Sequence, residues 1–402
     1  MDEIADFGAV ILLLSAGVGL ALLSTKLTER LPIPSPAIFL LAAAVASDVW
    51  PGLYDRAPIR SVERVAVVAL IVILFNGGLD IGWSRFRKSA FPIVALGVFG
   101  TFMTAGIVML FAHYALDFGW MLAGIAGAAL APTDPAVMFS VLGNHEIGGR
   151  SGTTLEGEAG LNDPAGIALM IGMIELATHA GASAAVVVRE FAVEMSVGAA
   201  VGIVGGWLLA TILRRIRLPS ASLHPLLALI LAAALYGGTS LLHGSGFLAV
   251  FLAGLIVGGG TPRQNAAISS FSSPLASLAE IAVFVALGLT VAFSSLSWRT
   301  WFEGIVLTLA LAVVARPVTV MVTLAGARFS RAERAFMAWS GLKGAVPILL
   351  AAFAVLERVD GAQRIYNVVF VVVLLSVLCQ GTLVGAVARR LGIPIRHRPS
   401  IA

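Results

Sequence analysis

Long apolar segments fill most of the chain, and short clusters of proline, glycine and charged residues separate them. A helix needs about 20 apolar residues to cross a bilayer, so segments of this length are typical of transmembrane helices. The pattern predicts an all-α polytopic membrane protein with about thirteen transmembrane helices. We expect the spans near residues 7–24, 35–50, 62–79, 90–112, 118–141, 153–178, 187–213, 221–242, 246–260, 275–293, 301–326, 334–356 and 365–388.

The composition also indicates a membrane protein. Of the 402 residues, 59% are hydrophobic and only 12% are charged, whereas about 25% of the residues of a soluble domain are charged. The first residues lack the basic region of a signal peptide, so we expect the first span to be retained as a helix. With one cysteine, Cys379, and scattered histidines, the sequence predicts no disulfide within the chain, no cysteine metal site and no cofactor.

The basic residues predict the orientation of the chain. Of its 26 Lys and Arg residues, 17 fall in one set of alternate loops and 7 in the other. Cytoplasmic loops carry the excess of basic residues, so we expect a cytoplasmic C-terminus and an N-terminus outside the cell (inner) membrane. The net charge of +4 then reflects topology and contact with anionic lipids of the bilayer, and we expect no nucleic-acid partner.

Two of the expected spans are interrupted near their middle. The span 118–141 contains residues 131–135 (Ala-Pro-Thr-Asp-Pro), and the span 334–356 contains residues 341–347 (Gly-Leu-Lys-Gly-Ala-Val-Pro). Proline has no N–H and cannot continue a regular helix, so both spans are predicted to unwind there.

The two interrupted spans are the fifth and the twelfth, and this odd offset makes them cross the membrane in opposite directions. Broken helices at matching places in two halves of a chain indicate an inverted-repeat transporter with a binding site near the bilayer midplane. We expect one membrane transport domain over residues 1–402, made of repeat one (about 7–178), a linker helix (about 187–213), repeat two (about 221–388) and a basic cytoplasmic tail (389–402).

The segment Glu156–Met170 carries the candidate chemistry. It reads as the start of a membrane helix, yet it contains Asn162 and Asp163. An ionisable group at membrane depth costs ~3 kcal/mol on insertion scales, so it indicates a functional site. Pro164 leaves the carbonyl of Gly160 without its helical partner. A carboxylate, an amide and a free carbonyl form an oxygen site that suits a monovalent cation or a proton.

Other charged residues lie within expected spans and need partners. Arg316 requires a carboxylate, for which Glu158 or Glu156 is available. Among the broken helices, Asp134 can meet free N–H groups, and Lys343 is suited to free carbonyl groups. The sequence leaves open whether Glu280 is a lumen-facing or an interface group.

Two other classes of protein deserve comparison with a transporter. An intramembrane aspartyl protease would use Asp134 and Asp163 as its catalytic pair, sharing a proton through a water, but neither aspartate stands in a Tyr-Asp or Gly-x-Gly-Asp signature. A channel would need a repeated selectivity-filter loop, and the sequence contains nothing that resembles one.

Five short segments, taken together, resemble one known family. They are residues 74–79 (Leu-Phe-Asn-Gly-Gly-Leu), 132–135 (Pro-Thr-Asp-Pro), 155–163 (Leu-Glu-Gly-Glu-Ala-Gly-Leu-Asn-Asp), 315–317 (Ala-Arg-Pro) and 341–347 (Gly-Leu-Lys-Gly-Ala-Val-Pro). From about residue 7 to 392 the chain resembles the sodium/proton exchanger family, in the first cation:proton antiporter class. Within that family it is most similar to the bacterial potassium/proton antiporters linked to cell-volume regulation.

The resemblance implies a homodimer of thirteen-helix protomers with crossing, unwound helices at the site. It further implies that Asp163 binds either the proton or the cation, with Thr133 and Asp134 in the unwound helix beside it. By the same resemblance, Glu158 pairs with Arg316, and Asn162 marks electroneutral members. Two departures affect ion selectivity: Ala159 stands where many relatives have serine, and Lys343 replaces the usual arginine.

The expected mechanism is competition for Asp163. Burial penalises the bare carboxylate, whereas a proton or a bound Na⁺ or K⁺ neutralises it. If only the neutral load crosses, alternating access to one site gives a one-for-one, electroneutral exchange of a cation for H⁺. The sequence alone does not distinguish Na⁺ from K⁺.

Overall fold

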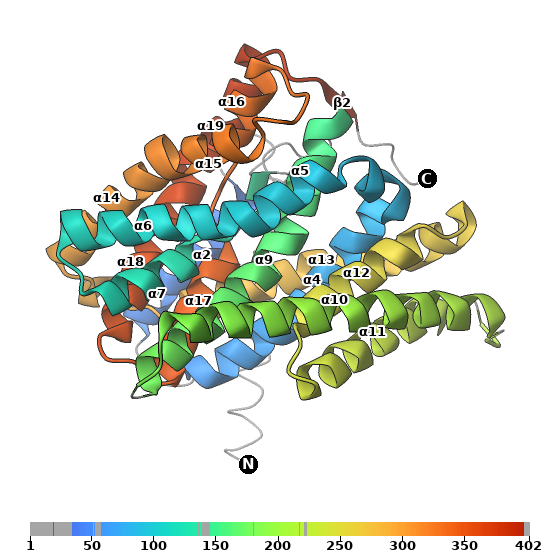
Figure 1. Ribbon diagram of the computed structural model, residues 1–402, viewed down its shortest axis with the longest axis horizontal. Helices are drawn as coiled ribbons and strands as arrows, with labels where there is room; N and C mark the ends of the chain where they lie inside the picture. The colour runs from blue at the N-terminus through green and yellow to red at the C-terminus, as the bar shows by residue number, and fades with distance from the viewer. Residues whose placement is uncertain are drawn as a thin grey trace.

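The computed structural model describes residues 34–50, 58–134, 137–138, 145–179, 181–216, 218–220 and 223–397, together with Gly19 and Gly52, and most of these residues are helical (Figure 1). The first helices are α2 (Ser35–Val49), α4 (Ile59–Lys88), α5 (Ala90–Val94), α6 (Gly100–Leu116), α7 (Trp120–Leu130), α9 (Gly149–Thr178) and α10 (Ala184–Arg215). The later helices are α11 (Leu223–Leu241), α12 (Gly246–Gly258), α13 (Pro262–Gly288), α14 (Trp298–Leu309), α15 (Arg316–Thr323), α16 (Arg331–Trp339), α17 (Ala345–Leu356), α18 (Ala362–Leu375) and α19 (Thr382–Arg390).

The described part of the chain has the helical, membrane-spanning architecture that the hydrophobic pattern predicts. Seven of its helical stretches are long and apolar enough to cross a membrane, and α2, α7, α12 and α17 are shorter apolar helices. Three of the long stretches contain a π-helical segment, at Ala95–Phe99, Ala310–Ala315 and Ser376–Gly381. The expected span near residues 7–24 lies outside the described residues apart from Gly19.

The tenth expected span begins earlier than the sequence indicates. The hydrophobic pattern predicts a start near residue 275, but α13 begins at Pro262 and continues through Pro274. Pro262 lies in the first turn, where the missing N–H has no helical partner to lose. Pro274 is tolerated inside the helix because neighbouring membrane helices can compensate for the lost hydrogen bond. The proline therefore did not mark a helix boundary.

A close contact between α4 and α12 fixes a bend near one end of α4. Gly82 has a φ of 66°, a left-handed conformation that interrupts the helix. A Cβ at this position would lie 2.9 Å from the carbonyl oxygen of Gly258 on α12. Glycine is required here both for the backbone conformation and for the close approach of the two helices.

Helix α9 runs through the middle of the molecule, where it packs against α4, α7 and α10 (Figure 1). Helix α10 also packs along α11 and α12. Large apolar side chains on α10 and α11 face outward, among them Val204, Trp207 and Leu241, which are 69%, 67% and 84% exposed. An outward apolar surface of this kind is suited to lipid.

One small β-ribbon was not anticipated in an all-α protein. Strand β1 (His145–Ile147), directly before α9, pairs antiparallel with β2 (Ile395–His397), which follows α19. The backbone N–H of Gly148 donates to the carbonyl of Pro394 at 2.9 Å and extends the contact. The end of the described chain is thereby attached to the start of the helix that carries Asp163.

Candidate ion-binding site

Two consecutive turns of α9 bring polar side chains into the interior. Glu158, Asn162 and Asp163 are 1%, 2% and 8% exposed. Helix α9 remains helical through Pro164. Because residues four apart lie on one face of a helix, Glu158 and Asn162 point in the same direction, and Asp163 is displaced by about 100°.

Glu158 has a charged partner. Its two carboxylate oxygens accept hydrogen bonds from the two terminal nitrogens of Arg316, with 2.8 Å between Arg316 Nη2 and Glu158 Oε2. Arg316 Nε donates to the backbone carbonyl of Met337 at 3.2 Å. Arg316 also packs against Gly341, where any Cβ would overlap the arginine side chain. The structure thus pairs Arg316 with Glu158, one of the two carboxylates that the sequence offered as its partner.

Thr133 connects this ion pair to Asn162. The Thr133 hydroxyl donates to Glu158 Oε1 at 3.4 Å and accepts from Asn162 Nδ2 at 2.7 Å. This arrangement fixes the orientation of the Asn162 amide, because its nitrogen must face the hydroxyl. The amide oxygen, Asn162 Oδ1, is then buried without a hydrogen-bond partner among the described residues. It is an oxygen available to a ligand.

The two interruptions in the helices meet beside α9. Helix α7 ends at Leu130, α16 at Trp339, and residues 131–134 and 341–344 lie outside the helices. The backbone N–H of Asp134 donates to the carbonyl of Leu342 at 2.8 Å. Gly344 lies directly against the Asp134 carboxylate, since a Cβ there would overlap it. The two non-helical segments, far apart in sequence, therefore form one structure.

Lys343 satisfies backbone groups that the first interruption leaves free. Its Nζ is 3.0 Å from the carbonyl oxygen of Ala131 and 2.8 Å from that of Pro132. The side chain is only 3% exposed. A cation bound to the free carbonyl end of a half-helix offsets the negative end of the helix dipole. The sequence anticipated this role for Lys343.

Asp163 differs from the other charged groups of the site. Within the described part of the chain, its carboxylate has neither a hydrogen bond nor an ion pair at contact distance. Its side chain is buried in an apolar interior, where an uncompensated negative charge is costly. Asp163 is a buried carboxylate without a dedicated counterion, and therefore one that a proton or a cation can neutralise.

Two residues that support the site were missed in the sequence. The backbone N–H of Lys343 donates to Ser376 Oγ at 3.0 Å, and Ser376 Oγ donates to Gln380 Oε1 at 2.8 Å. Both side chains are buried and lie at the π-helical segment after α18. The only signal available was two polar residues within an apolar segment, which is too common to single them out.

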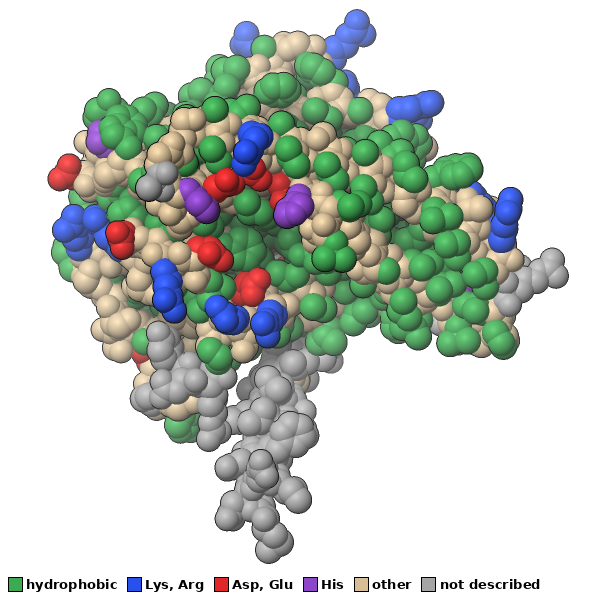
Figure 2. Space-filling model, turned by 60° about the horizontal axis from the view of Figure 1, so that its bottom comes forward, with side chains coloured by type: hydrophobic (Ala, Val, Ile, Leu, Met, Phe, Trp, Pro, Cys, Tyr) green, Lys and Arg blue, Asp and Glu red, His purple; other side chains and the backbone are tan. Residues whose placement is uncertain are grey.

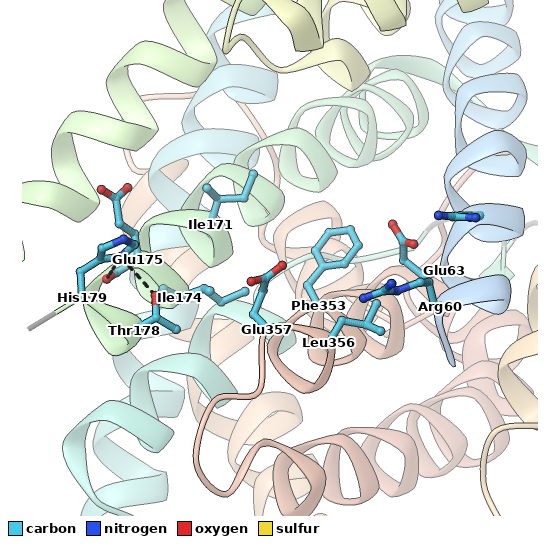
Figure 3. Close-up of a pocket in the computed structure, with 11 residues that line it drawn as sticks. Arg60, Glu63, Ile171, Ile174, Glu175, Thr178, His179, Phe353, Leu356 and Glu357 are labelled. Carbon is cyan, nitrogen blue, oxygen red and sulfur yellow. Dashed lines mark hydrogen bonds between the residues drawn. The ribbon is translucent and has the colours of Figure 1, made fainter. Parts of the chain in front are cut away.

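A cleft on the surface lies beyond the far end of the site. It has a volume of about 480 Å³ and is lined by residues of α4, α9 and α17. Figure 2 shows charged and histidine side chains around this hollow and apolar side chains within it. In Figure 3, Phe353 lies between Glu357 and Glu63, while Ile171 comes from α9. Ile171 is eight residues from Asp163, or ~12 Å along the helix, so the cleft contains none of the predicted site residues.

Comparison with known proteins identifies the family. Residues 13–390 match the family model described as "Sodium/hydrogen exchanger, transmembrane". The chain is 32% identical to the K(+)/H(+) antiporter NhaP2 of Shewanella oneidensis over 403 aligned residues, covering 99% of this chain and 69% of the relative. It is 27% identical to the Na(+)/H(+) antiporter ApNhaP of Aphanothece halophytica, covering 95% and 74% of the two chains.

A solved structure agrees with this assignment. The sodium proton antiporter MjNhaP1 from Methanocaldococcus jannaschii superposes with a TM-score of 0.80 at 25% sequence identity, covering 97% of this chain and 99% of the other. The match extends over nearly the entire length of both proteins, so it concerns the arrangement of the whole helical domain. The chain belongs to the transmembrane sodium/hydrogen exchanger family and is a secondary transporter rather than an enzyme.

Proposed function

We propose that this protein exchanges a monovalent cation, K⁺ or Na⁺, for H⁺ across a bacterial inner membrane, and that proton and cation compete for Asp163. The observation that carries the proposal is the electrostatic state of Asp163. It is buried, 8% exposed, and has no dedicated counterion among the described residues, whereas Glu158, which is also buried, is paired with Arg316. Relatives named as K(+)/H(+) and Na(+)/H(+) antiporters support both candidate cations.

We propose that oxygen atoms of three residues, Asp163, Asn162 and Thr133, are the ligands of the cation. Asp163 provides the charge, Asn162 Oδ1 is a buried acceptor without a partner, and Thr133 lies within hydrogen-bond distance of Asn162. Carboxylate, amide and hydroxyl oxygens suit hard cations such as Na⁺ and K⁺. When a proton binds instead, it neutralises the same carboxylate, so the two ions exclude one another.

The exchange requires that the site open alternately to the two sides of the membrane. The contact between residues 131–134 and 341–344 supports an inverted-repeat arrangement in which two unwound helices cross at the site. A bare Asp163 carboxylate would be costly to move through a region of low dielectric constant. Only the protonated or cation-loaded site then moves, and the exchange is electroneutral, with one H⁺ for one cation.

We assign the C-terminus to the cytoplasm from the distribution of basic residues, and we expect two copies of the chain to form a homodimer in the bilayer. An aspartyl protease, the alternative from another class, finds no support among the related proteins, which are transporters.

Reconstitution tests the proposed exchange. Proteoliposomes that contain a pH-sensitive dye and an imposed pH gradient should lose the gradient when Na⁺, K⁺ or Li⁺ is added outside. The order of the three half-saturating concentrations gives the selectivity. A gradient that survives all three cations, in vesicles that contain folded protein, would contradict cation/proton exchange.

A further inference from the structure

A polar stripe on α13 leads from a second surface pocket toward the ion-binding site. It consists of Asn265, Ser269, Ser272, Ser273 and Glu280. At ~100° per residue these five positions fall within about 100° of one another around the helix. The stripe is the less exposed face of α13, since its residues are buried or half-buried. Exposed residues lie on other sides of the helix, among them Ala267, Ser270, Ser277 and Leu278.

The stripe begins in a pocket between α4, α12 and α13. This pocket has a volume of about 380 Å³, and its lining includes Asp80, Arg85, Asn265 and Ser269. Asn265 Nδ2 donates to the carbonyl of Gly258 at 2.7 Å, which turns Asn265 Oδ1 away from that partner. The basic end of α4, with Arg85, places the pocket on the side of the membrane that we expect to be cytoplasmic.

Further along, the stripe makes a polar contact with α4. The side-chain oxygen of Asn76 accepts hydrogen bonds from Ser272 at 2.8 Å and from Ser273 at 3.1 Å. Asn76 Nδ2 donates to Asp80 Oδ2 at 3.1 Å, which connects this contact back to the pocket. Asn76 therefore joins the serines of α13 to Asp80 in the lining of the pocket.

The stripe ends at Glu280, about two turns beyond Ser273. Helix α13 packs against α17, the helix that follows residues 341–344. Among the described residues, Glu280 Oε1 is a buried oxygen without a hydrogen-bond partner. Among the described residues, the buried side-chain oxygens without a partner belong to Asn162, Asn265, Glu280 and Ser340. Three of these four are carboxylate or amide oxygens, and they mark the beginning of the stripe, its end and the site itself.

We propose that this stripe is a transit path for the monovalent cation, with Asn265 as its outer ligand and Glu280 as the carboxylate that passes the ion to Asp134 and Asp163. Unpartnered oxygen atoms at both ends of the stripe are the groups that a partly dehydrated cation requires. Glu280 takes up and releases its ion on the same side of the membrane, so it does not change the one-for-one stoichiometry.

This inference rests on the proposed cation/proton exchange, and vesicles of opposite orientation test the two separately. Exchange is measured with Na⁺ or K⁺ added at the Arg85 face or at the opposite face. Glu280→Gln should raise the half-saturating cation concentration at the Arg85 face by about tenfold, the effect of losing one charged contact. The concentration at the other face should change less than about twofold, because a loss confined to the path leaves the central ligands intact.

A second variant removes no charge. Ser269→Phe fills the pocket and should slow cation entry from the Arg85 face while leaving the melting temperature unchanged. Ser277→Ala, on the exposed side of α13, and Asp360→Asn, in the turn before α18, are matched controls that should behave as the unmodified protein.

The outcomes separate the two proposals. If the unmodified protein exchanges cations but Glu280→Gln and Ser269→Phe leave both half-saturating concentrations unchanged, the stripe is a structural contact and the transit path is wrong. Equal increases at both faces would also contradict it, since a path affects one side. If the unmodified protein exchanges no cation with H⁺, the proposed function itself fails, and the transit path fails with it.

Discussion

Two successive turns of α9 each carry a buried carboxylate, and the two carboxylates differ in whether they have a charged partner. Glu158, 1% exposed, is held by both terminal nitrogens of Arg316 and by the hydroxyl of Thr133. Asp163, 8% exposed, has no such partner among the described residues. A buried charge is stable only when it is compensated. The charge of Glu158 is compensated within the chain by Arg316, whereas the charge of Asp163 must be compensated by a proton or a cation from solution.

The sharpest way to test this difference is to neutralise each carboxylate in turn. Asp163→Asn should abolish exchange completely and leave the melting temperature near that of the parent. The amide has the size of the carboxylate but can neither release a proton nor balance a cation. The dye assay measures the exchange, and thermal unfolding in detergent is the control. Cation-driven proton flux in the folded variant would mean that another group carries the ion.

Removing either member of the Glu158–Arg316 pair should instead lower the stability of the protein. Glu158→Ala or Arg316→Ala leaves an uncompensated buried charge, which costs about 3–5 kcal/mol. Replacing both residues by apolar side chains of similar volume should cost less than either single change. The melting temperatures of the two single variants and of the double variant test this expectation. Arg189→Ala, which breaks an exposed ion pair with Glu190, serves as the control and should leave the melting temperature unchanged.

If the losses from Glu158→Ala and Arg316→Ala were equal and simply added in the double variant, the two residues would not act as a pair. The contrast between the two turns of α9 would then lose its physical basis.

Replacing Lys343 should have a smaller effect than the changes at Asp163, Glu158 and Arg316. Lys343→Met leaves the carbonyls of Ala131 and Pro132 without a donor, at about 1–3 kcal/mol for each group that stays unsatisfied. The exchange rate should fall by about tenfold or more, because a cost of 1.4 kcal/mol at the site is one factor of ten. Lys343→Arg retains a donor and should recover most of the rate. Comparable rates for the methionine and arginine variants would show that Lys343 has no such role.

The smallest expected effect concerns the membrane potential. One titrating carboxylate exchanges one proton for one monovalent cation, so no net charge moves in a cycle. Each net charge moved would add about 2.3 kcal/mol per 100 mV to the driving force. Proteoliposomes clamped at different potentials with valinomycin, with Na⁺ or Li⁺ as the test ion, should exchange at one rate. A steep dependence on voltage would mean that a second proton moves, and Glu156, half-buried two turns before Asp163, would be the candidate carrier.

The sequence predicts more of this site than of its surroundings, for physical reasons. A charged residue within an apolar span needs a partner. The sequence therefore predicts that Arg316 pairs with a carboxylate and that Lys343 binds free carbonyl groups. The presence of the charges alone could not decide between Glu156 and Glu158, because that choice depends on how α9 is rotated against α15; only the family resemblance indicated Glu158. Polar neutral residues carry a weaker signal, so Ser376 and Gln380 were missed.

Helix boundaries were harder to predict where proline is the only marker. Pro274 remains inside α13 because tertiary packing compensates for its missing N–H, and packing is not visible in one sequence. The β-ribbon depends on strands that are far apart in the chain, and three residues give no recognisable pattern. Its existence could be learned only from the structure.

The most direct test of competition at Asp163 is to count the protons released when a cation binds. The purified protein in weakly buffered detergent solution is titrated with Na⁺ or K⁺ while calorimetry measures binding and a pH electrode measures released protons. The account predicts about one proton per bound cation at a pH where Asp163 is protonated, and none from Asp163→Asn. Cation binding without proton release in the unmodified protein, or unchanged release in Asp163→Asn, would contradict it.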